Sequence, residues 1–352
     1  MGDFLFKKIC FILCFFFIIP DTAYAKEIEI SAQSAIVIDA YTKTVLYSKK
    51  ADTKRAVAST TKVMTCLLAC ESGKLGDTVT ITNKMLEGCE GSLIYLEAGD
   101  RITLYDLVCG AMIASGNDAA NAIAFHISNS LKSFAELMNK RAKELGMLST
   151  KFVTPSGLDK NFNHSTANDM ALLARQAVLN NELIKIASMK SYEITINSKK
   201  QKIYNHNKLL SYDENYIGLK TGYTEKAGRC LISAYKYGGS VIITVTLNAY
   251  DDWKDHKTLV NYSKKCYKDI NQKESVEINI VGGEKNSAFC SCVYELKSLD
   301  RVEIKRYYYP FAYAPIYKGE ALGREDLFIN GILVKTAEIT ANEDVEIWQT
   351  TK

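Results

Sequence analysis

The first patterned segments of the chain are short, rich in β-branched residues and separated by polar residues. Residues 34–40 (SAIVIDA) and 44–49 (TVLYSK) have the length and composition of strands. The polar stretch between them is short enough for a turn. The sequence therefore predicts a β-hairpin in this N-terminal region.

The next part of the chain changes to a helical spacing of apolar residues. One helical pattern begins at Ser59 and stops at Gly73. Further helical patterns cover residues 104–113, 118–128, 131–145 and 167–179. We therefore predict that the middle of the chain is mostly α-helical.

Beyond Lys220 the pattern returns to strands. Residues 229–237 and 240–249 are β-rich and are separated by Gly238-Gly239, a strong signal for a two-residue hairpin. One more amphipathic helix fits residues 255–267. Strands at both ends with helices between them predict an α+β architecture whose terminal strands share one sheet.

The C-terminal part has a different pattern. Residues 269–275 (DINQKES) are polar and predict a linker. Short alternating strands follow from Val276, and Gly319, Gly323 and Gly331 interrupt the pattern near the C-terminus. We predict a small all-β domain here. The predicted organisation is residues 1–25 as a signal peptide, 26–270 as one domain and 271–352 as the β-rich domain.

The N-terminus has the features of a secretory signal. Lys7 and Lys8 precede an apolar run over residues 9–19, and Ala23-Tyr24-Ala25 places small residues at a cleavage site. The run is shorter than the roughly 20 residues that a membrane-spanning helix needs. Export is therefore predicted, with an uncleaved N-terminal anchor as the alternative.

Composition narrows the functional classes. Of 352 residues, 47% are hydrophobic and 24% are charged, which is ordinary for a globular protein. The formal net charge of +4 comes from charges spread along the chain, so nucleic acid is not a predicted partner. With four His and neither a CxxC nor an HExxH motif, we predict no metal centre.

Eight cysteines follow residue 25. Their even number permits disulfides, but we expect most of them to be buried free thiols.

Ser59-Thr60-Thr61-Lys62 is an S-x-x-K motif at the start of a helix. Three residues of helical separation place the hydroxyl and the amine on one face, where a neutral lysine can activate a serine nucleophile. Backbone N–H groups at a helix start can also stabilise an oxyanion. About one such match is expected by chance in a chain this long. Ser233–Lys236 is a second copy, but it lies in a strand that places the two side chains on opposite faces.

Two further motifs follow in a specific order. Ser115-Gly116-Asn117 lies in a predicted turn between helices, and Lys220-Thr221-Gly222 lies at the entry to the β-hairpin. The order S-x-x-K, S-x-N, K-T-G is the motif set of penicillin-binding proteins and class A β-lactamases.

With these motifs the chain resembles the low-molecular-weight penicillin-binding proteins that are serine-type D-alanyl-D-alanine carboxypeptidases. The similarity extends to residues 90–96, 113–120, 143–147, 152–158, 165–167 and 218–224. The resemblance implies a catalytic domain made of an antiparallel sheet packed with helices beside a helical subdomain, with the active site between them. A small all-β domain would follow it.

The resemblance also implies roles in acyl transfer. Ser59 would attack the carbonyl between the two terminal D-alanines, and Lys62 would take its proton. Ser115 would pass a proton toward the leaving amine, and Asn117 would hold Lys62 and the substrate amide.

The K-T-G strand would bind the rest of the substrate. Lys220 and Thr221 would hold the terminal carboxylate, and Gly222 would leave room for the substrate along the strand. The N–H groups of Ser59 and Tyr223 would form the oxyanion hole. No cofactor is implied.

Some positions stay open in the sequence. Members of this family often have an arginine in the segment that here covers residues 251–256, and this chain has none there. Arg229 could supplement Lys220 at the carboxylate or could be a surface strand residue. No role is assigned to His164 or His206.

Two other functions are compatible with parts of the sequence. A β-lactamase needs a Glu to activate the deacylating water, and Glu193–Asn197 has a suitable spacing, but its alternation is that of a strand. A catalytically silent wall scaffold would have no reason to keep Lys62 beside Ser59. We therefore predict a carboxypeptidase whose partners are peptidoglycan stem peptides and, as covalent inhibitors, β-lactam antibiotics.

The C-terminal residues predict no stable membrane anchor. They end in ITANEDVEIWQTTK, which carries Glu343, Asp344 and Glu346 and has neither a sustained helical period nor a basic face. We expect the protein to be exported and to lie on the cell-wall side of the membrane.

Overall fold

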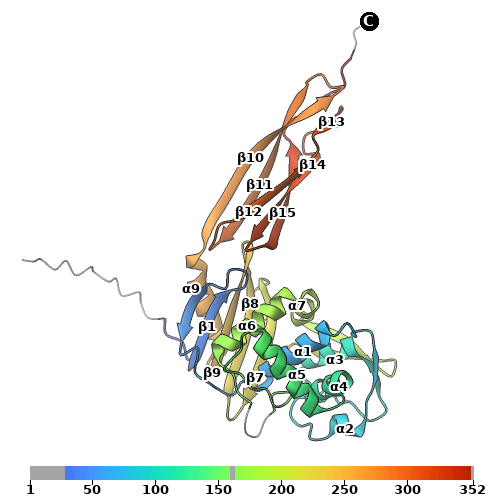
Figure 1. Cartoon of the computed structure of the whole chain (residues 1–352), viewed down its shortest axis with the longest axis vertical. Coiled ribbons are helices and arrows are strands. Elements are labelled where there is room, and N and C mark those ends of the chain that lie inside the picture. The colour runs from blue at the N-terminus through green and yellow to red at the C-terminus, as the bar shows by residue number, and fades with distance from the viewer. Residues whose placement is uncertain (1–27, 159–162, 350–352) are drawn as a thin grey trace, which may run out of the picture.

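The computed structural model describes residues 28–158 and 163–349, and the predicted signal peptide, residues 1–25, lies outside this range. An N-terminal part combines a sheet with helices, and an elongated C-terminal sheet extends away from it as an arm (Figure 1). This arrangement agrees with the predicted α+β fold followed by an all-β region.

A five-stranded antiparallel sheet forms the base of the N-terminal part. Its order is β2-β1-β9-β8-β7. The predicted hairpins are confirmed, and β1 pairs with β9, so the terminal strands share one sheet as predicted. The strands are β1 (Ser34–Asp39), β2 (Val45–Lys49), β7 (Tyr216–Thr224), β8 (Gly228–Tyr237) and β9 (Ser240–Ala249).

Helices cover both faces of this sheet. Along β1, Ile36 and Ile38 belong to the large core shared with the helical part, whereas Ala35 and Val37 pack with the helix on the opposite face, α9. Every residue of β1 is therefore buried, because a strand covered on both faces has no solvent side.

The predicted helices are present, with small shifts at their ends. The pattern from Ser59 divides into a 3₁₀ turn, η1 (Ala58–Thr61), and the buried helix α1 (Lys62–Glu71). The last helix begins earlier than predicted because the Asp251 side chain accepts a hydrogen bond from Lys254 N–H and caps it. The other helices are α2 (Asn83–Leu86), α3 (Leu104–Met112), α4 (Asn117–Ser128), α5 (Leu131–Glu144), α6 (Ala167–Leu179), α7 (Asn181–Ala187), α8 (Leu209–Tyr212), α9 (Asp252–Ser263) and the 3₁₀ turn η2 (Lys264–Cys266).

Two small hairpins complete the helical part. They pair β3 (Thr78–Thr80) with β4 (Arg101–Thr103) and β5 (Ser191–Ile196) with β6 (Lys199–Tyr204). The strand character predicted for the Glu193–Asn197 segment is thereby confirmed up to Ile196.

The C-terminal sheet has six strands in the order β12-β14-β15-β11-β10-β13 and a hydrophobic core of its own. The all-β character predicted from Val276 is confirmed. The strands are β10 (Lys268–Val281), β11 (Ser287–Ser298), β12 (Glu303–Tyr308), β13 (Phe311–Tyr313), β14 (Ala321–Ile329) and β15 (Ile332–Ala341).

The prediction of a linker over residues 269–275 was wrong. This segment is the first half of β10 and pairs with β11 without interruption, from Lys268 opposite Ser298 to Asn279 opposite Ser287. A polar segment can form a strand when a neighbouring strand satisfies its backbone groups, and composition does not reveal that neighbour. The expected domain boundary at residues 270/271 therefore falls inside a strand.

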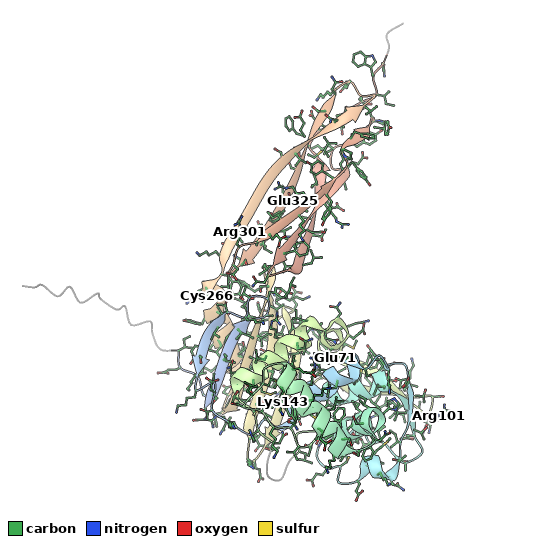
Figure 2. The ribbon with its side chains drawn as sticks, in the orientation of Figure 1. Glu71, Arg101, Lys143, Cys266, Arg301 and Glu325 are labelled. Atoms are coloured by element: carbon green, nitrogen blue, oxygen red, sulfur yellow. The ribbon has the colours of Figure 1, made fainter. Side chains whose placement is uncertain are left out.

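The two parts meet at the turn between β8 and β9. A Cβ on Gly239 would lie 1.9 Å from Leu296 Cδ1, and one on Gly238 would lie 2.5 Å from Lys297 Cβ. The two glycines thus allow the turn to contact β11 closely. Cys266 lies at the same junction (Figure 2) and is exposed.

The eight cysteines among the described residues are all free thiols, and five of them are buried, as expected. In the ranges 28–158 and 163–349, none of the helices has the length and apolar character needed to cross a membrane.

Candidate active site

Ser59 and Lys62 lie at the junction of η1 and α1, at the inner edge of the helical part. Lys62 Nζ is 3.0 Å from Ser59 Oγ, so the predicted placement on one face is confirmed. Ser59 is half-buried, whereas Lys62 is fully buried. Ala58, just before the serine, has a φ of +47°, a conformation that costs energy for a residue with a side chain.

Three oxygen atoms surround the Lys62 amine. Nζ donates to Asn117 Oδ1 at 2.6 Å and to the Ser156 carbonyl at 2.8 Å, and Ser59 Oγ is the third. A neutral amine has two N–H donors and one lone pair. Because Asn117 Oδ1 and the Ser156 carbonyl can only accept, they orient the lone pair of a neutral Lys62 toward the Ser59 hydroxyl.

The surroundings of Lys62 favour this neutral form. Burial, and then the positive charge of Lys220, lower the pKa of Lys62 well below its usual value. The amine can therefore accept a proton from Ser59.

The Ser115-Gly116-Asn117 turn lies beside Ser59 and Lys62: Ser115 lines the same cleft as Ser59, and Asn117 contacts Lys62. Ser115 is buried and has a φ of +62°. Asn117 begins α4, and its Nδ2 donates to the Glu90 carbonyl at 2.5 Å. That bond fixes the side-chain amide so that its oxygen faces Lys62.

The K-T-G motif lies on β7, the strand at the edge of the sheet. Lys220 is buried, its Nζ donates to the Thr221 carbonyl at 3.1 Å, and burial lowers its pKa to about 8. Lys220 is therefore mostly protonated at neutral pH and loses its positive charge as the pH rises through about 8.

Gly222 has a packing role that the sequence did not reveal. A Cβ at this position would lie 3.0 Å from the backbone nitrogens of both Ser59 and Thr60. Besides any room it leaves for a substrate, Gly222 therefore lets β7 approach the turn that carries Ser59.

These motifs surround one cleft of about 270 Å³. Five of the eight predicted site residues line it, namely Ser59, Ser115, Thr221, Gly222 and Tyr223, and the other three, Lys62, Asn117 and Lys220, are buried. Ser92, His206, Arg229 and Asp252 also line the cleft, and of these the sequence had suggested only Arg229.

The structure places Arg229 at the cleft. It lies opposite Tyr223 in the β7–β8 pair, and Asp252 Oδ1 accepts from its Nε at 2.8 Å and lies 2.7 Å from its Nη2. The guanidinium also lies 5.7 Å from the ring centroid of Trp253. Asp252 thus fixes a cation at the cleft wall, although the segment 251–256 has no arginine of its own.

The loop formed by Pro155, Ser156 and Gly157 contacts η1 and α1, which carry Ser59 and Lys62. Sequence reasoning assigned this loop no role. Thr65 Oγ1 donates to the Pro155 carbonyl at 2.6 Å, and the Ser156 carbonyl accepts from Lys62. Both contacts use backbone oxygens, which any residue type supplies. Only the similarity of residues 152–158 to the family could have directed attention to this loop.

We expect Gly157→Ala to lower both stability and acylation. A Cβ at Gly157 would lie 2.0 Å from the Ala58 carbonyl oxygen, next to Ser59, so the turn must shift. Gly73→Ala is the matched control, because Gly73 has a similar φ of +71° and nothing within 4 Å of the added atom. The control should lose only about 1 kcal/mol. Equal losses of thermal stability and of acylation in the two variants would show that the Cβ added at Gly157 does not displace Ala58 and Ser59.

The fold and this cleft define a class of protein: a serine hydrolase of the penicillin-binding type, with S-x-x-K at the junction of η1 and α1 and K-T-G on the edge strand. Residues 21–251 match the family model described as D-alanyl-D-alanine carboxypeptidase, and the chain belongs to that family. The predicted resemblance is therefore confirmed, and with it the serine carboxypeptidase activity.

Similar proteins cover nearly the whole chain. The chain is 31% identical to the D-alanyl-D-alanine carboxypeptidase DacF of Bacillus subtilis over 93% of its own length and 89% of that protein. It is also 31% identical to DacC of Escherichia coli, over 94% and 90%. Penicillin binding protein 5 of Haemophilus influenzae is a structural neighbour with a TM-score of 0.64 and 27% identity, covering 90% of this chain and 98% of that one.

Proposed function

We propose that this carboxypeptidase removes the terminal D-alanine from peptidoglycan stem peptides through an acyl-enzyme on Ser59. The single observation that carries the proposal is the buried Lys62 amine, 3.0 Å from Ser59 Oγ and held by two acceptors. That arrangement supplies a nucleophile together with its base.

Acylation begins when Lys62 takes the proton of Ser59. The Oγ atom attacks the carbonyl carbon of the penultimate D-alanine, and the resulting tetrahedral intermediate then breaks the C–N bond. The proton held by Lys62 returns through the Ser115 hydroxyl to the leaving amine, which departs as free D-alanine. Asn117 keeps Lys62 in place and binds the substrate amide.

The N–H groups of Ser59 and Tyr223 would stabilise the oxyanion of this intermediate. Gly222 supports this assignment, because the absence of a side chain lets β7 run close to the nitrogen of Ser59. Two fixed donors aimed at one developing charge give a large rate contribution.

Three groups would recognise the terminal carboxylate of the substrate. Lys220 and Thr221 lie on β7, and Arg229 faces the cleft from β8. An arginine held by Asp252 offers a preorganised donor pair for a carboxylate. In this chain Arg229 would supply the cation that the family often has in the segment 251–256.

Water then hydrolyses the acyl-enzyme and returns Ser59 to its free state. A penicillin carries a strained amide and a carboxylate, so it would acylate Ser59 in the same way. We propose β-lactam antibiotics as covalent inhibitors on this basis.

The β-lactamase alternative is less well supported. Glu193 lies on β5, and Asn197 uses its side chain within the helical part, accepting from Arg101 N–H and donating to Asp100. Neither residue is among those that line the cleft.

Release of D-alanine from diacetyl-Lys-D-Ala-D-Ala tests the proposal. We expect the protein without residues 1–25 to release D-alanine and to form a long-lived complex with penicillin. Rapid hydrolysis of penicillin without release of D-alanine would instead show a β-lactamase.

We further propose that residues 1–25 direct export and are removed, and that the catalytic and β-rich domains meet near the start of β10 rather than at residues 270/271. The enzyme would then work on the wall side of the membrane. Cell fractionation with N-terminal sequencing is the test, and we expect a mature protein that begins near Lys26. Salt-resistant membrane association with residues 1–25 retained would show an N-terminal anchor.

A further inference from the structure

An exposed aromatic cluster outside the active site lies on the C-terminal sheet. Three consecutive tyrosines, Tyr307, Tyr308 and Tyr309, line a cleft of about 470 Å³ at the end of the edge strand β12. Their exposed fractions are 49%, 47% and 64%. Exposed rings gathered in one concave place are typical of a binding site rather than of a scattered surface.

The backbone of the sheet is shaped to form this cleft. Tyr308 lies opposite Gly323 on β14, where a Cβ would come within 2.6 Å of the Tyr307 carbonyl oxygen and of Tyr308 Cβ. The pairing of β14 with β15 also shifts register between Ala321 and Gly323. The glycine thus lets β14 lie close to the strand that carries Tyr307 and Tyr308, beside a bulge in the β14–β15 pair.

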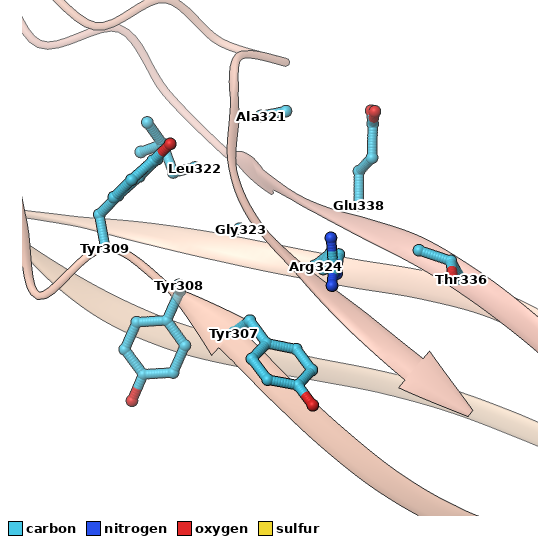
Figure 3. Close-up of a pocket in the computed structure, with 9 residues that line it drawn as sticks. All are labelled: Tyr307, Tyr308, Tyr309, Ala321, Leu322, Gly323, Arg324, Thr336 and Glu338. Atoms are coloured by element: carbon cyan, nitrogen blue, oxygen red, sulfur yellow. The ribbon is translucent and has the colours of Figure 1, made fainter. Parts of the chain in front are cut away.

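Polar side chains flank the rings. Arg324 lies on β14, next to the tyrosine strand β12, and Thr336 and Glu338 lie on β15, the strand beyond it (Figure 3). Arg324 lies opposite both Tyr307 and Glu338 in the sheet, and its guanidinium is 5.1 Å from the ring centroid of Tyr307. The cleft therefore offers aromatic faces beside hydrogen-bonding groups.

We propose that this cleft binds a saccharide segment of the peptidoglycan glycan strand. A pyranose ring has C–H groups on its faces and hydroxyl groups at its rim, so it pairs with an aromatic face and polar neighbours. The one cation and the one carboxylate among the lining residues balance, which suits a neutral polymer. An anionic lipid surface would call for several clustered cations instead.

The location of the cleft fits this ligand. Its lining residues lie on the C-terminal arm, whereas Ser59 and its cleft lie in the N-terminal part. The arm extends away from that part (Figure 1). This inference rests on the proposed function, in which the substrate is a peptide attached to a glycan strand. Binding of the strand on the arm would raise the local concentration of stem peptides at the active site.

Saccharide binding can be measured without any catalysis. The probe is the tetramer of N-acetylglucosamine, which carries no peptide, and binding to the full mature chain is followed by NMR titration. We expect Tyr308→Ala and Tyr309→Ala each to weaken binding on the order of tenfold, as truncation of an aromatic anchor does. Arg324→Gln should weaken it less. Tyr317→Ala is the matched control, because Tyr317 is a 59% exposed tyrosine of the same region that does not line the cleft.

Release of D-alanine from the soluble tripeptide separates the two proposals. The tyrosine variants should keep this activity and lose rate only on intact peptidoglycan. Tyrosine-dependent saccharide binding in a protein that releases no D-alanine would uphold the cleft and refute the proposed function. Absence of saccharide binding, or binding that the tyrosine variants leave unchanged, would overturn the inference. Tyrosine-dependent binding to phosphatidylglycerol vesicles in place of the saccharide would also overturn it.

Discussion

Ser59→Ala should abolish covalent labelling by a fluorescent penicillin while the protein stays folded. The Oγ atom is the proposed attacking atom, so without it no acyl bond can form. The stability cost should be about 1 kcal/mol or less, because Ser59 makes no capping bond and its Oγ contacts the Lys62 amine instead. Gel fluorescence and a thermal melt measure the two effects.

Ser233→Ala is the control, since Ser233–Lys236 repeats the S-x-x-K spacing. Ser233 is buried, and its Oγ lies 2.7 Å from His256 Nδ1, so the variant should label like the wild type. Its melting temperature should fall because His256 loses a buried partner, a loss of about 1–3 kcal/mol. Labelling that survives in Ser59→Ala would remove Ser59 from the mechanism.

Lys62→Arg should reduce the acylation rate constant by a factor on the order of 10³, the contribution of a general base. A guanidinium keeps the positive charge but cannot give up its proton in a protein, so it cannot accept one from Ser59. Lys220→Arg should cost only about tenfold, because carboxylate binding needs a cation and no proton transfer. Stopped-flow acylation by penicillin measures both rate constants.

The pH profile separates the two lysines further. Burial lowers the pKa of Lys220 to about 8, so this lysine should lose its positive charge, which we propose binds the substrate carboxylate, as the pH rises through that value. Acylation of the free enzyme should therefore fall above about pH 8 in the wild type and not in Lys220→Arg, where the cation persists. Equal rate losses in the two lysine variants, or an alkaline fall that remains in Lys220→Arg, would contradict the separate roles.

Local patterns predicted most of the fold because those elements follow local rules. The two-residue Gly238-Gly239 hairpin and the helix over residues 131–145 appear where the sequence placed them. The error over residues 269–275 has a different origin. That polar segment becomes a strand through its backbone pairing with β11, a partner that lies beyond the reach of local composition.

The active site was predictable to the extent that its residues form short motifs. Ser59 and Lys62 are three residues apart on one turn, so their contact follows from helical geometry. The contact of Lys62 with Asn117 joins residues 55 positions apart, and no local rule gives it. The family resemblance supplied that link, and it supplied no role for Ser156, whose backbone oxygen completes the surroundings of the amine.

The sequence by itself determined the chemical groups and their local order: a serine and a lysine on one helical face, an S-x-N turn and a K-T-G strand. Tertiary structure alone decided how deeply those groups are buried, what their pKa values are and which residues they contact. Folding buries Lys62 near Lys220, and this lowers the pKa of Lys62 and favours its proposed role as a base. Arg229 lines the cleft, where Asp252 holds it. Burial and long-range contacts set the pKa of a side chain and its direction, and both depend on residues far away in the sequence.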